Sequence, residues 1–352
     1  MISNLIIDFS DLYEYSELNE LKLFILNNES TFFQHPDWLA AVSVSTNSKG
    51  CYILTFKDDI LINALPLFIE KNDYSGFDIL SANPRVETIY GGNIADRNVN
   101  INVIKLIENT FKGIDINTIR IQESPFKPLD DVSYSGFNKD IIYQTPLWDI
   151  SEDIGLIWKS LDRKSIRYVI EKLEKKKIQV VVNKSDFLNQ FYHDAKITFE
   201  KTGNKISDFS LYESIFNNFC LKKNRDIKGL LISLLDSDIY LGSIIGIVYK
   251  NTITYFAVST SDEGKKAGAN DYLLWTLLKM GKEYGCNLFD LLIVNKKDRF
   301  LGRDLFKLKY CKNLIPVYYY TYKLMYGKIK NLQKAISHPG TIIKKFRKII
   351  NN

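Results

Sequence analysis

The chain has 352 residues, of which 45% are hydrophobic and 25% are charged, and its formal net charge is +6, so we expect a globular protein of up to two domains. The start, MISNLIIDFSDLYEY, has no basic region and no uncharged apolar run is long enough to cross a bilayer, which argues against a secretory signal or a membrane span and favours the cytoplasm. The few histidines and the four scattered cysteines predict reduced thiols and no metal site; the cysteines are Cys51, Cys220, Cys286 and Cys311.

The first half of the chain predicts strands and one helix in a simple order. CYILTFKDDILINALPLFIEK (51–71) reads as a strand, a tight Asp-Asp turn and a second strand. A Gly-containing loop, ETIYGGNIADRN (87–98), is followed by an amphipathic helix over 101–114 and a strand over 117–122.

The central stretch LIWKSLDRKSIRYVIEKLEKKKIQVVV (156–182) predicts a helix followed by a strand. Arg163 and Arg167 lie one turn apart on a different face from an apolar stripe, where two guanidinium groups could clamp a phosphate or a carboxylate. The alternative is a charged helix face in contact with water. The apolar stripe consists of Ile166, Val169, Ile170 and Leu173.

The second half repeats the order of elements found in the first. GLLISLLDSDIYLGSIIGIVYK (229–250) predicts strand, acidic turn and strand, and TITYFAVSTS (252–261) continues the sheet. A Gly-containing loop, a helix over 271–285 and a buried strand over 287–294 follow. Two tandem α/β units explain this repetition better than one irregular domain.

The loop EGKKAGAN (263–270) precedes a helix whose first turn has free backbone N–H groups, which are an intrinsic anion site. Lys265 and Lys266, together with the backbone at Gly268, Ala269 and Asn270, could hold a pyrophosphate. The alternative is an ordinary loop in which Asn270 caps the helix.

The stretch FLGRDLFKLKYCKN (300–313) combines lysines and aromatic residues. If it forms a strand, Lys307 and Lys309 point to the same side and create one cationic face beside Phe306 and Tyr310. The alternative is a solvated surface strand.

The last segment, 323–352, contains seven lysines and Arg347 and no acidic residue. Its apolar residues recur at helical spacing on both sides of Pro339-Gly340, which predicts a basic amphipathic helical tail. Such a tail suits peripheral contact with an anionic membrane surface. The alternative is a C-terminal helix packed on the protein.

Several motifs, in this order, resemble the FemAB-like branch of the GNAT acyltransferase superfamily. They extend from about Phe32 to Tyr322, and the closing motif has Tyr310-Cys311 where the family has Phe-Gly. The motifs are FFQHPDWLAAV, LINALPLFIE, IYGGN, WKSLDRKSIRYVIEKLEKKKIQV, FYHDAKITFEKTG, ANDYLLWTLLKMGKEYGCNLFDL and GRDLFKLKYCKN.

The resemblance implies an α/β protein of two tandem GNAT-like domains, with mixed sheets flanked by helices. We expect the first domain over 1–150, a second, donor-binding and catalytic domain over 151–322, and the basic tail over 323–352. The family transfers acyl or aminoacyl groups to amines. It includes peptidoglycan enzymes that use aminoacyl-tRNA and acyltransferases of capsule and exopolysaccharide gene sets that use acyl-CoA.

The resemblance also implies roles for individual residues. Lys307 maps onto a lysine implicated at the reacting centre, where it would neutralise charge on the donor or on the oxyanion, with Phe306 positioning it. Asp290, at the end of a strand, is a candidate proton acceptor or else a loop cap. Arg163, Arg167 and Trp38 are candidates for binding the acceptor or a phosphate.

The residues after Trp38 lack the lysine with which the peptidoglycan enzymes grip a nucleotide-linked muropeptide. We therefore expect an N-acyltransferase that moves an acyl group from acyl-CoA, without a metal, to an amine of a cell-envelope glycan or a lipid-linked precursor. One alternative is an aminoacyl-tRNA-dependent transferase that extends a peptidoglycan stem peptide. Another is a non-catalytic module that binds a glycan precursor.

Overall fold

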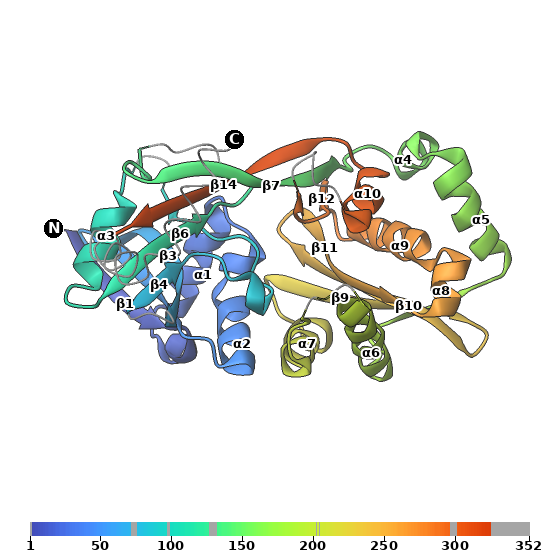
Figure 1. The fold of residues 1–352 in the computed structure, drawn as a ribbon, viewed down its shortest axis with the longest axis horizontal. Helices are drawn as coiled ribbons and strands as arrows, with labels where there is room; N and C mark the ends of the chain where they lie inside the picture. The colour runs from blue at the N-terminus through green and yellow to red at the C-terminus, as the bar shows by residue number, and fades with distance from the viewer. Residues whose placement is uncertain are drawn as a thin grey trace, which may run out of the picture.

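The computed structural model describes residues 2–71, 76–96, 99–126, 132–201, 203, 205–295 and 301–324. The chain forms two α/β halves that lie side by side, with strands β7 and β14 running between them (Figure 1). The predicted basic tail lies almost wholly outside the described residues.

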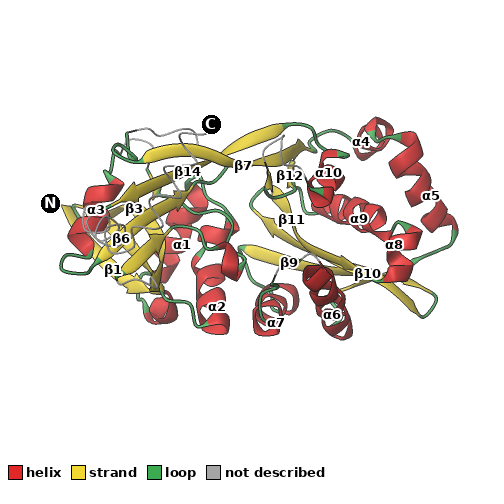
Figure 2. Ribbon diagram, in the orientation of Figure 1, coloured by secondary structure: helices red, strands yellow, loops and turns green. Residues whose placement is uncertain are grey.

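Strands dominate the first half, and helices cover their faces (Figure 2). The elements are β1 (Ile2–Asp8), α1 (Leu18–Asn27), α2 (Pro36–Thr46), β2 (Gly50–Lys57), β3 (Ile60–Lys71), β4 (Phe77–Leu80), β5 (Ile94–Ala95), α3 (Val103–Thr110), β6 (Ile116–Gln122) and β7 (Asn138–Asp149).

In the second half, α6 and α7 cover one face of the sheet, and α8, α9 and α10 cover the other (Figure 1). The elements are α4 (Ile154–Ser160), α5 (Tyr168–Lys175), β8 (Gln179–Val182), α6 (Asp186–Lys201), α7 (Phe209–Ile215), β9 (Ile227–Asp236), β10 (Ile239–Tyr249), β11 (Thr252–Thr260), α8 (Asp262–Ala267), α9 (Ala269–Glu283), β12 (Leu288–Asp290), β13 (Val294–Asn295), α10 (Gly302–Leu308) and β14 (Leu314–Lys323).

One mixed sheet runs through both halves in the order β1-β2-β3-β4-β6-β14-β7-β12-β11-β10-β9-β8. Strand β14, the last described strand, pairs antiparallel with β6 and with β7, and β7 continues into the second half by pairing with β12. The mixed α/β fold class is confirmed. The division near residue 150 stays a prediction, because the sheet is continuous across that point.

Both predicted hairpins are present. Asp58 and Asp59 have φ values of 49° and 62°, so both central residues of the β2–β3 turn adopt the left-handed conformation that matches the twist of a hairpin. Ser237 does the same between β9 and β10, with φ 57°. Short polar side chains tolerate this conformation better than most, which explains the acidic turns of the sequence.

Three predicted segments differ in the structure. The strand expected over 287–294 is interrupted, because Leu292 has φ 57° and turns the chain between β12 and β13. The loop expected over 263–270 is mostly helix α8, which Ser261 caps by accepting a hydrogen bond from the N–H of Gly264. The strand expected around Lys307 is helix α10.

The two halves share part of their hydrophobic core. Trp38 of α2 is fully buried, stacks at 5.8 Å on Phe219 and meets Phe256 edge-on at 5.4 Å. Separate clusters fill the space beneath α3 and beneath α9. Burial of this aromatic group fixes the halves against each other.

All four cysteines are free thiols, and Cys220 is the one that is not fully buried. Among the described helices, none is long and apolar enough to span a membrane.

Gly264 provides a test of how α8 packs. A Cβ atom on this residue would lie 1.7 Å from the backbone oxygen of Leu241 in β10, so α8 can approach the sheet only with glycine there. We expect Gly264→Ala to lower the free energy of unfolding by about 3 kcal/mol, the upper range for overpacking. Gly302→Ala is the matched control, because its Cβ would meet nothing within 4 Å. Equal stability of the two variants in urea titration would contradict this packing.

Candidate active site

Asp290 ends strand β12 and is 1% exposed, at the point where the two halves meet. Its Oδ1 accepts hydrogen bonds from Thr145 Oγ1 and from the N–H of Leu292, both at 2.8 Å. The hydroxyl of Tyr90 lies 3.0 Å from Thr145 Oγ1 and 3.4 Å from Asp290 Oδ1. The positive φ of Leu292 brings its N–H back to the carboxylate, which explains the interrupted strand.

Lys307 of α10 lies next to this carboxylate. Its Nζ donates a hydrogen bond to the carbonyl oxygen of Ile293 at 3.1 Å and lies 5.7 Å from the centre of the Tyr255 ring. Asp290 and Lys307 interact electrostatically, so the structure brings together two residues that the sequence placed 17 positions apart.

Burial moves both pKa values toward neutrality. It raises the pKa of Asp290 to about 6, while the hydrogen bonds to the carboxylate and the charge of Lys307 limit the rise. It lowers the pKa of Lys307 to about 8, against the attraction of Asp290. At pH 7 the carboxylate is therefore mostly ionised and the ammonium mostly protonated, and each can change state at little cost.

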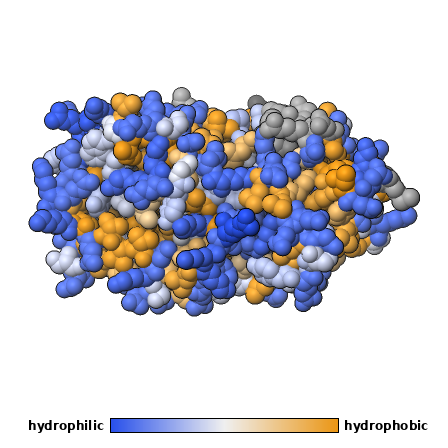
Figure 3. All heavy atoms as spheres, turned by 180° about the vertical axis from the view of Figure 1, so that it is seen from behind, coloured by the Kyte–Doolittle hydropathy of each residue, from blue (hydrophilic) through white to orange (hydrophobic). Residues whose placement is uncertain are grey.

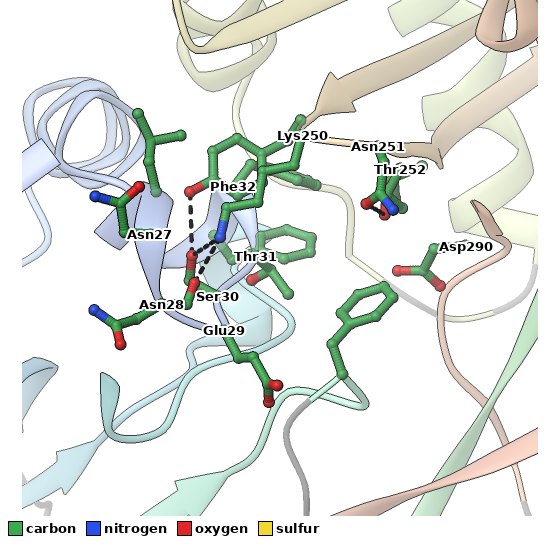
Figure 4. Close-up of a pocket in the computed structure, with 15 residues that line it drawn as sticks. Asn27, Asn28, Glu29, Ser30, Thr31, Phe32, Lys250, Asn251, Thr252 and Asp290 are labelled. Carbon is green, nitrogen blue, oxygen red and sulfur yellow. Dashed lines mark hydrogen bonds between the residues drawn. The ribbon is translucent and has the colours of Figure 1, made fainter. Parts of the chain in front are cut away.

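Asp290 lies on the wall of a cavity of about 280 Å³ between the halves. The cavity is bounded by the end of α1 and the residues after it, by Phe126, and by the β10–β11 turn. Figure 4 shows Asp290 across from Thr31 and Phe32, with Asn251 and Thr252 above it. Aromatic walls with a few ionisable side chains, here Glu29, Lys250 and Asp290, suit the binding of a small polar group.

Lys250 builds the opposite wall. Its Nζ donates hydrogen bonds to the carbonyl oxygens of Ile25 and Asn28, at 3.2 and 2.6 Å, and to Ser30 Oγ at 3.0 Å (Figure 4). Burial lowers the pKa of Lys250 to about 8. A cation at the C-terminus of α1 satisfies free carbonyl groups and ties the second half to the first.

Lys307 and Lys309 do not form a shared cationic face, contrary to the prediction. Two residues apart on a helix lie about 200° around the axis from each other. Lys309 instead forms an ion pair with Asp271 of α9 at 3.0 Å, and Asp271 also accepts a hydrogen bond from Tyr310. Phe306 is half-buried and packs edge-on against Tyr310. These contacts fix the end of α10 on α9.

The proposed donor residues lie where α8 meets α9. Lys265 and Lys266 are exposed on α8, and Lys265 pairs with Asp262 at 3.2 Å. Gly268, with φ 80°, ends α8 and begins α9, whose first residue, Ala269, is buried. Asn270 is therefore inside the helix and does not cap it.

The predicted arginine pair lies on a wide π-helical turn, Arg163–Arg167, that leads into α5. Arg163 is exposed, whereas the Nε of Arg167 is buried and has no hydrogen-bonding partner among the described residues. The same holds for Oδ1 of Asn270. Helix α5 packs against α9, and a Cβ on Gly268 would meet Val169 at 2.4 Å. The turn that carries the two arginines therefore lies beside the proposed donor-binding residues at the junction of α8 and α9.

Trp38 has no exposed surface, and its Nε1 donates a hydrogen bond to Thr88 Oγ1 at 3.2 Å. Trp38 can therefore affect acceptor binding only indirectly. It packs against Phe32 and Phe33, and these two side chains line the cavity.

Within the described ranges, one group of side chains has the spacing of a metal site: His35, Asp37 and Asp226. His35 Nδ1 accepts a hydrogen bond from the N–H of Asp37, and Nε2 lies 3.4 Å from Asp226. The ammonium of Lys22 lies 2.8 Å from Asp37. His35 Nε2 has no hydrogen-bond partner among the described residues. The N–H of Asp37 and the ammonium of Lys22 already contact two of the three side chains, which is typical of a structural network of hydrogen bonds and ion pairs.

Thr145, Tyr255 and Lys250 could not be identified from sequence patterns. Tyr90 was visible only as part of the IYGGN motif. Hydroxyl groups on strands and a lysine in a hairpin turn are common on protein surfaces. Tertiary contacts alone distinguish these residues: Thr145 and Lys250 contact the other half, and Tyr255 lies beside Lys307.

Residues 161–305 match a family model described as an acetyltransferase (GNAT) domain. Among solved structures, FemX has a TM-score of 0.66 with 16% identity over 87% of this chain and 96% of that one. L-PGS from Bacillus licheniformis has a TM-score of 0.55 with 13% identity, over 95% and 97% of the two chains. A tandem GNAT protein from the clavulanic acid biosynthesis pathway has a TM-score of 0.55 with 9% identity, over 92% and 98%. A search of curated protein sequences found no match.

Residues 161–305 are therefore similar to a GNAT acetyltransferase domain, and the fold of the whole chain is similar to that of a tandem GNAT protein. The resemblance to the FemAB-like branch, first seen in the sequence motifs, is confirmed.

The hydrogen bond from Thr145 to Asp290 stabilises the ionised carboxylate. Thr145→Val removes it, so we expect the pKa of Asp290 to rise from its value of about 6. Infrared difference spectra against pH, with Asp290→Asn to assign the band, measure this directly.

Thr55→Val serves as the control, because Thr55 is also buried on a strand but its hydroxyl has no partner among the described residues. It should leave the Asp290 band where it is. An unchanged band in Thr145→Val would show that the contact does not affect the carboxylate.

Proposed function

We propose that the chain is an N-acyltransferase in which Asp290 and Lys307 act on an amine and an acyl carbonyl. The observation that carries this proposal is a buried carboxylate, Asp290, on the wall of a cavity and within electrostatic reach of Lys307, in a chain that matches an acetyltransferase domain. The pKa values on either side of neutrality are those expected of groups that exchange protons or charge during a reaction.

In the proposed reaction the acceptor amine enters the cavity and attacks the acyl carbonyl carbon. A carbon–nitrogen bond forms, and Asp290 takes the proton that the nitrogen loses. Lys307, with its ammonium held on the carbonyl of Ile293, stabilises the negative oxygen of the tetrahedral intermediate. The carbon–sulfur bond of the thioester then breaks, and the thiolate leaves with a proton returned from Asp290.

Acyl-CoA is the proposed donor, with its phosphates near the start of α9 and beside Lys265 and Lys266. The unpaired, buried Nε of Arg167 supports an anion there, because a buried donor without a partner is costly. An amine of a cell-envelope glycan or lipid-linked precursor is the proposed acceptor. We also propose a cytoplasmic location with peripheral membrane contact through 323–352.

The pH dependence of catalysis tests the roles of the pair. The rate requires ionised Asp290 and protonated Lys307, so kcat/KM should rise through about pH 6 and fall above about pH 8. We expect Lys307→Met to lower kcat/KM about 100-fold, the usual loss for one oxyanion donor.

Lys307→Arg is the matched variant, because arginine keeps its charge at high pH. Whatever activity it retains should no longer fall above pH 8. If Lys307→Met is folded and turns over at the wild-type rate, the role assigned to Lys307 is wrong.

Donor binding separates the proposal from its alternatives. Calorimetry should show saturable binding of acetyl-CoA that weakens about 10-fold when Lys265 and Lys266 are both changed to Gln, since each loses a charge-assisted contact. Lys196→Gln with Lys205→Gln removes the same charge elsewhere and should not affect binding.

Salt-sensitive binding of charged tRNA without binding of CoA would instead favour the aminoacyl-tRNA transferase. Binding of neither would favour the non-catalytic module.

A further inference from the structure

Strand β1 forms one edge of the sheet, and its outer side is open. It pairs with β2 in unbroken register, and no other strand in the described part of the chain pairs with it. Ile2, Leu5 and Ile6 are 69%, 41% and 46% exposed. Soluble proteins protect such edges with lysine, proline or a bulge, and β1 has none of these. Figure 3, the view from behind, shows hydrophobic surface over the first half, on the right, beside hydrophilic side chains.

The chain continues from this open edge into an acidic surface. Residues 8–20 contain five acids and no basic residue: Asp8, Asp11, Glu14, Glu17 and Glu20. All five are exposed, and none forms an ion pair with a cation in the ranges that the structure describes. A groove of about 310 Å³ lies between this surface and β1, and it is lined by Ile6, Ile7, Asp8, Asp11, Glu14 and Tyr15. The groove thus presents carboxylates next to apolar side chains.

The basic tail has the complementary composition. Residues 325–352 contain seven cations and no acid, and their apolar residues recur at helical spacing. The part after Pro339-Gly340, TIIKKFRKIINN (341–352), combines four cations with isoleucines and Phe346. A helix of this composition would cover the open edge with its apolar face and bring its cations to the carboxylates of the groove.

The register of the sheet places the tail within reach of the groove. From Lys323 at the end of β14, one row of paired residues runs through β6, Asp78 of β4 and Glu70 of β3 to the start of β2. Asp8 pairs at that same end of β2. Five strand spacings separate β14 from β1, or about 24 Å. As the helix that the sequence predicts, residues 324–338 would be about 22 Å long, so the next segment would start at the β1 edge.

We infer that segment 341–352 docks in the acidic groove beside β1 of its own chain, and that an anionic membrane surface competes with the groove for the same cations. The contact is intramolecular, so the effective concentration of the tail is in the millimolar range and a weak interaction suffices. Docking does not depend on the proposed acyl transfer, whereas the competition rests on the proposed membrane contact of the tail.

The test uses the full chain with a photoreactive benzophenone side chain in place of Phe346. Mass spectrometry locates the crosslinks, and a denaturing gel separates single chains from crosslinked pairs. We expect crosslinks within one chain to residues 2–15. Their yield should fall about 5-fold with vesicles that contain phosphatidylglycerol, and should not change with vesicles of phosphatidylcholine alone.

The variant Asp8→Asn with Asp11→Asn and Glu14→Gln removes the acids of the groove. We expect its crosslinks to residues 2–15 to fall about 10-fold, because three ion pairs of modest strength are lost together. It should bind the anionic vesicles more tightly by a similar factor, since the groove no longer withholds the tail. Asp8→Glu with Asp11→Glu and Glu14→Asp keeps the charge and should crosslink as the wild type does.

The control is Asp238→Asn with Glu152→Gln and Glu283→Gln, which removes the same charge from exposed positions in the second half. It should leave the crosslinks where they are. It also measures how far a lower negative charge alone strengthens binding to the vesicles, and the groove variant must exceed that effect.

Docking is overturned if the wild type crosslinks elsewhere or not at all, or if the groove variant and the control give equal yields. Crosslinks that join two chains would also overturn it and would assign the groove to the tail of a second copy. If the groove variant loses its crosslinks but binds anionic vesicles as the control does, the competition is wrong. Assays of acyl transfer do not enter these measurements, so failure of the proposed function would leave them unchanged.

Discussion

A carboxylate buried at the junction of two half-molecules must receive hydrogen bonds, and Asp290 receives them from both sides. Thr145 and Tyr90 donate from the first half and the N–H of Leu292 donates from the second, where the charge of Lys307 also favours the ionised carboxylate. Neither half alone supplies the full set. The fold therefore couples the chemistry of the site to the packing of the halves, including the shared aromatic cluster around Trp38.

The low polarity around Asp290 destabilises its charged form, and the resulting shift in pKa suits the group to proton transfer. A surface aspartate is too weak a base to accept a proton readily near pH 7, and a surface lysine stays protonated well above it. Burial raises the pKa of Asp290 and lowers the pKa of Lys307, so the two pKa values approach each other. Lys250 shows a similar shift for a structural reason, which illustrates that a perturbed lysine is not by itself a sign of catalysis.

Much of the framework could be predicted from the sequence. Alternating apolar residues and acidic turns located the hairpins β2–β3 and β9–β10, and helical spacing located α3 and α9. Sequence patterns predicted the wrong secondary structure where tertiary contacts override local preference. α8 reads as a loop because of its glycines, yet Gly264 is there so that the helix can touch β10. Lys307 was found through the family resemblance, but its partners lie on distant strands, and no periodicity links Thr145 to Asp290.

Strand β14 has a consequence for how the protein is made. It fills the place between β6 and β7, although nearly 200 residues separate it from β6 along the chain. During synthesis, the first half must leave the ribosome with β6 and β7 unpaired at that position and wait until the second half has been translated. Such long-range pairing slows folding, and open strand edges invite aggregation in the interval. A nascent chain that has passed residue 150 thus lacks the strand that pairs with β6 and β7 until residues 314–323 emerge.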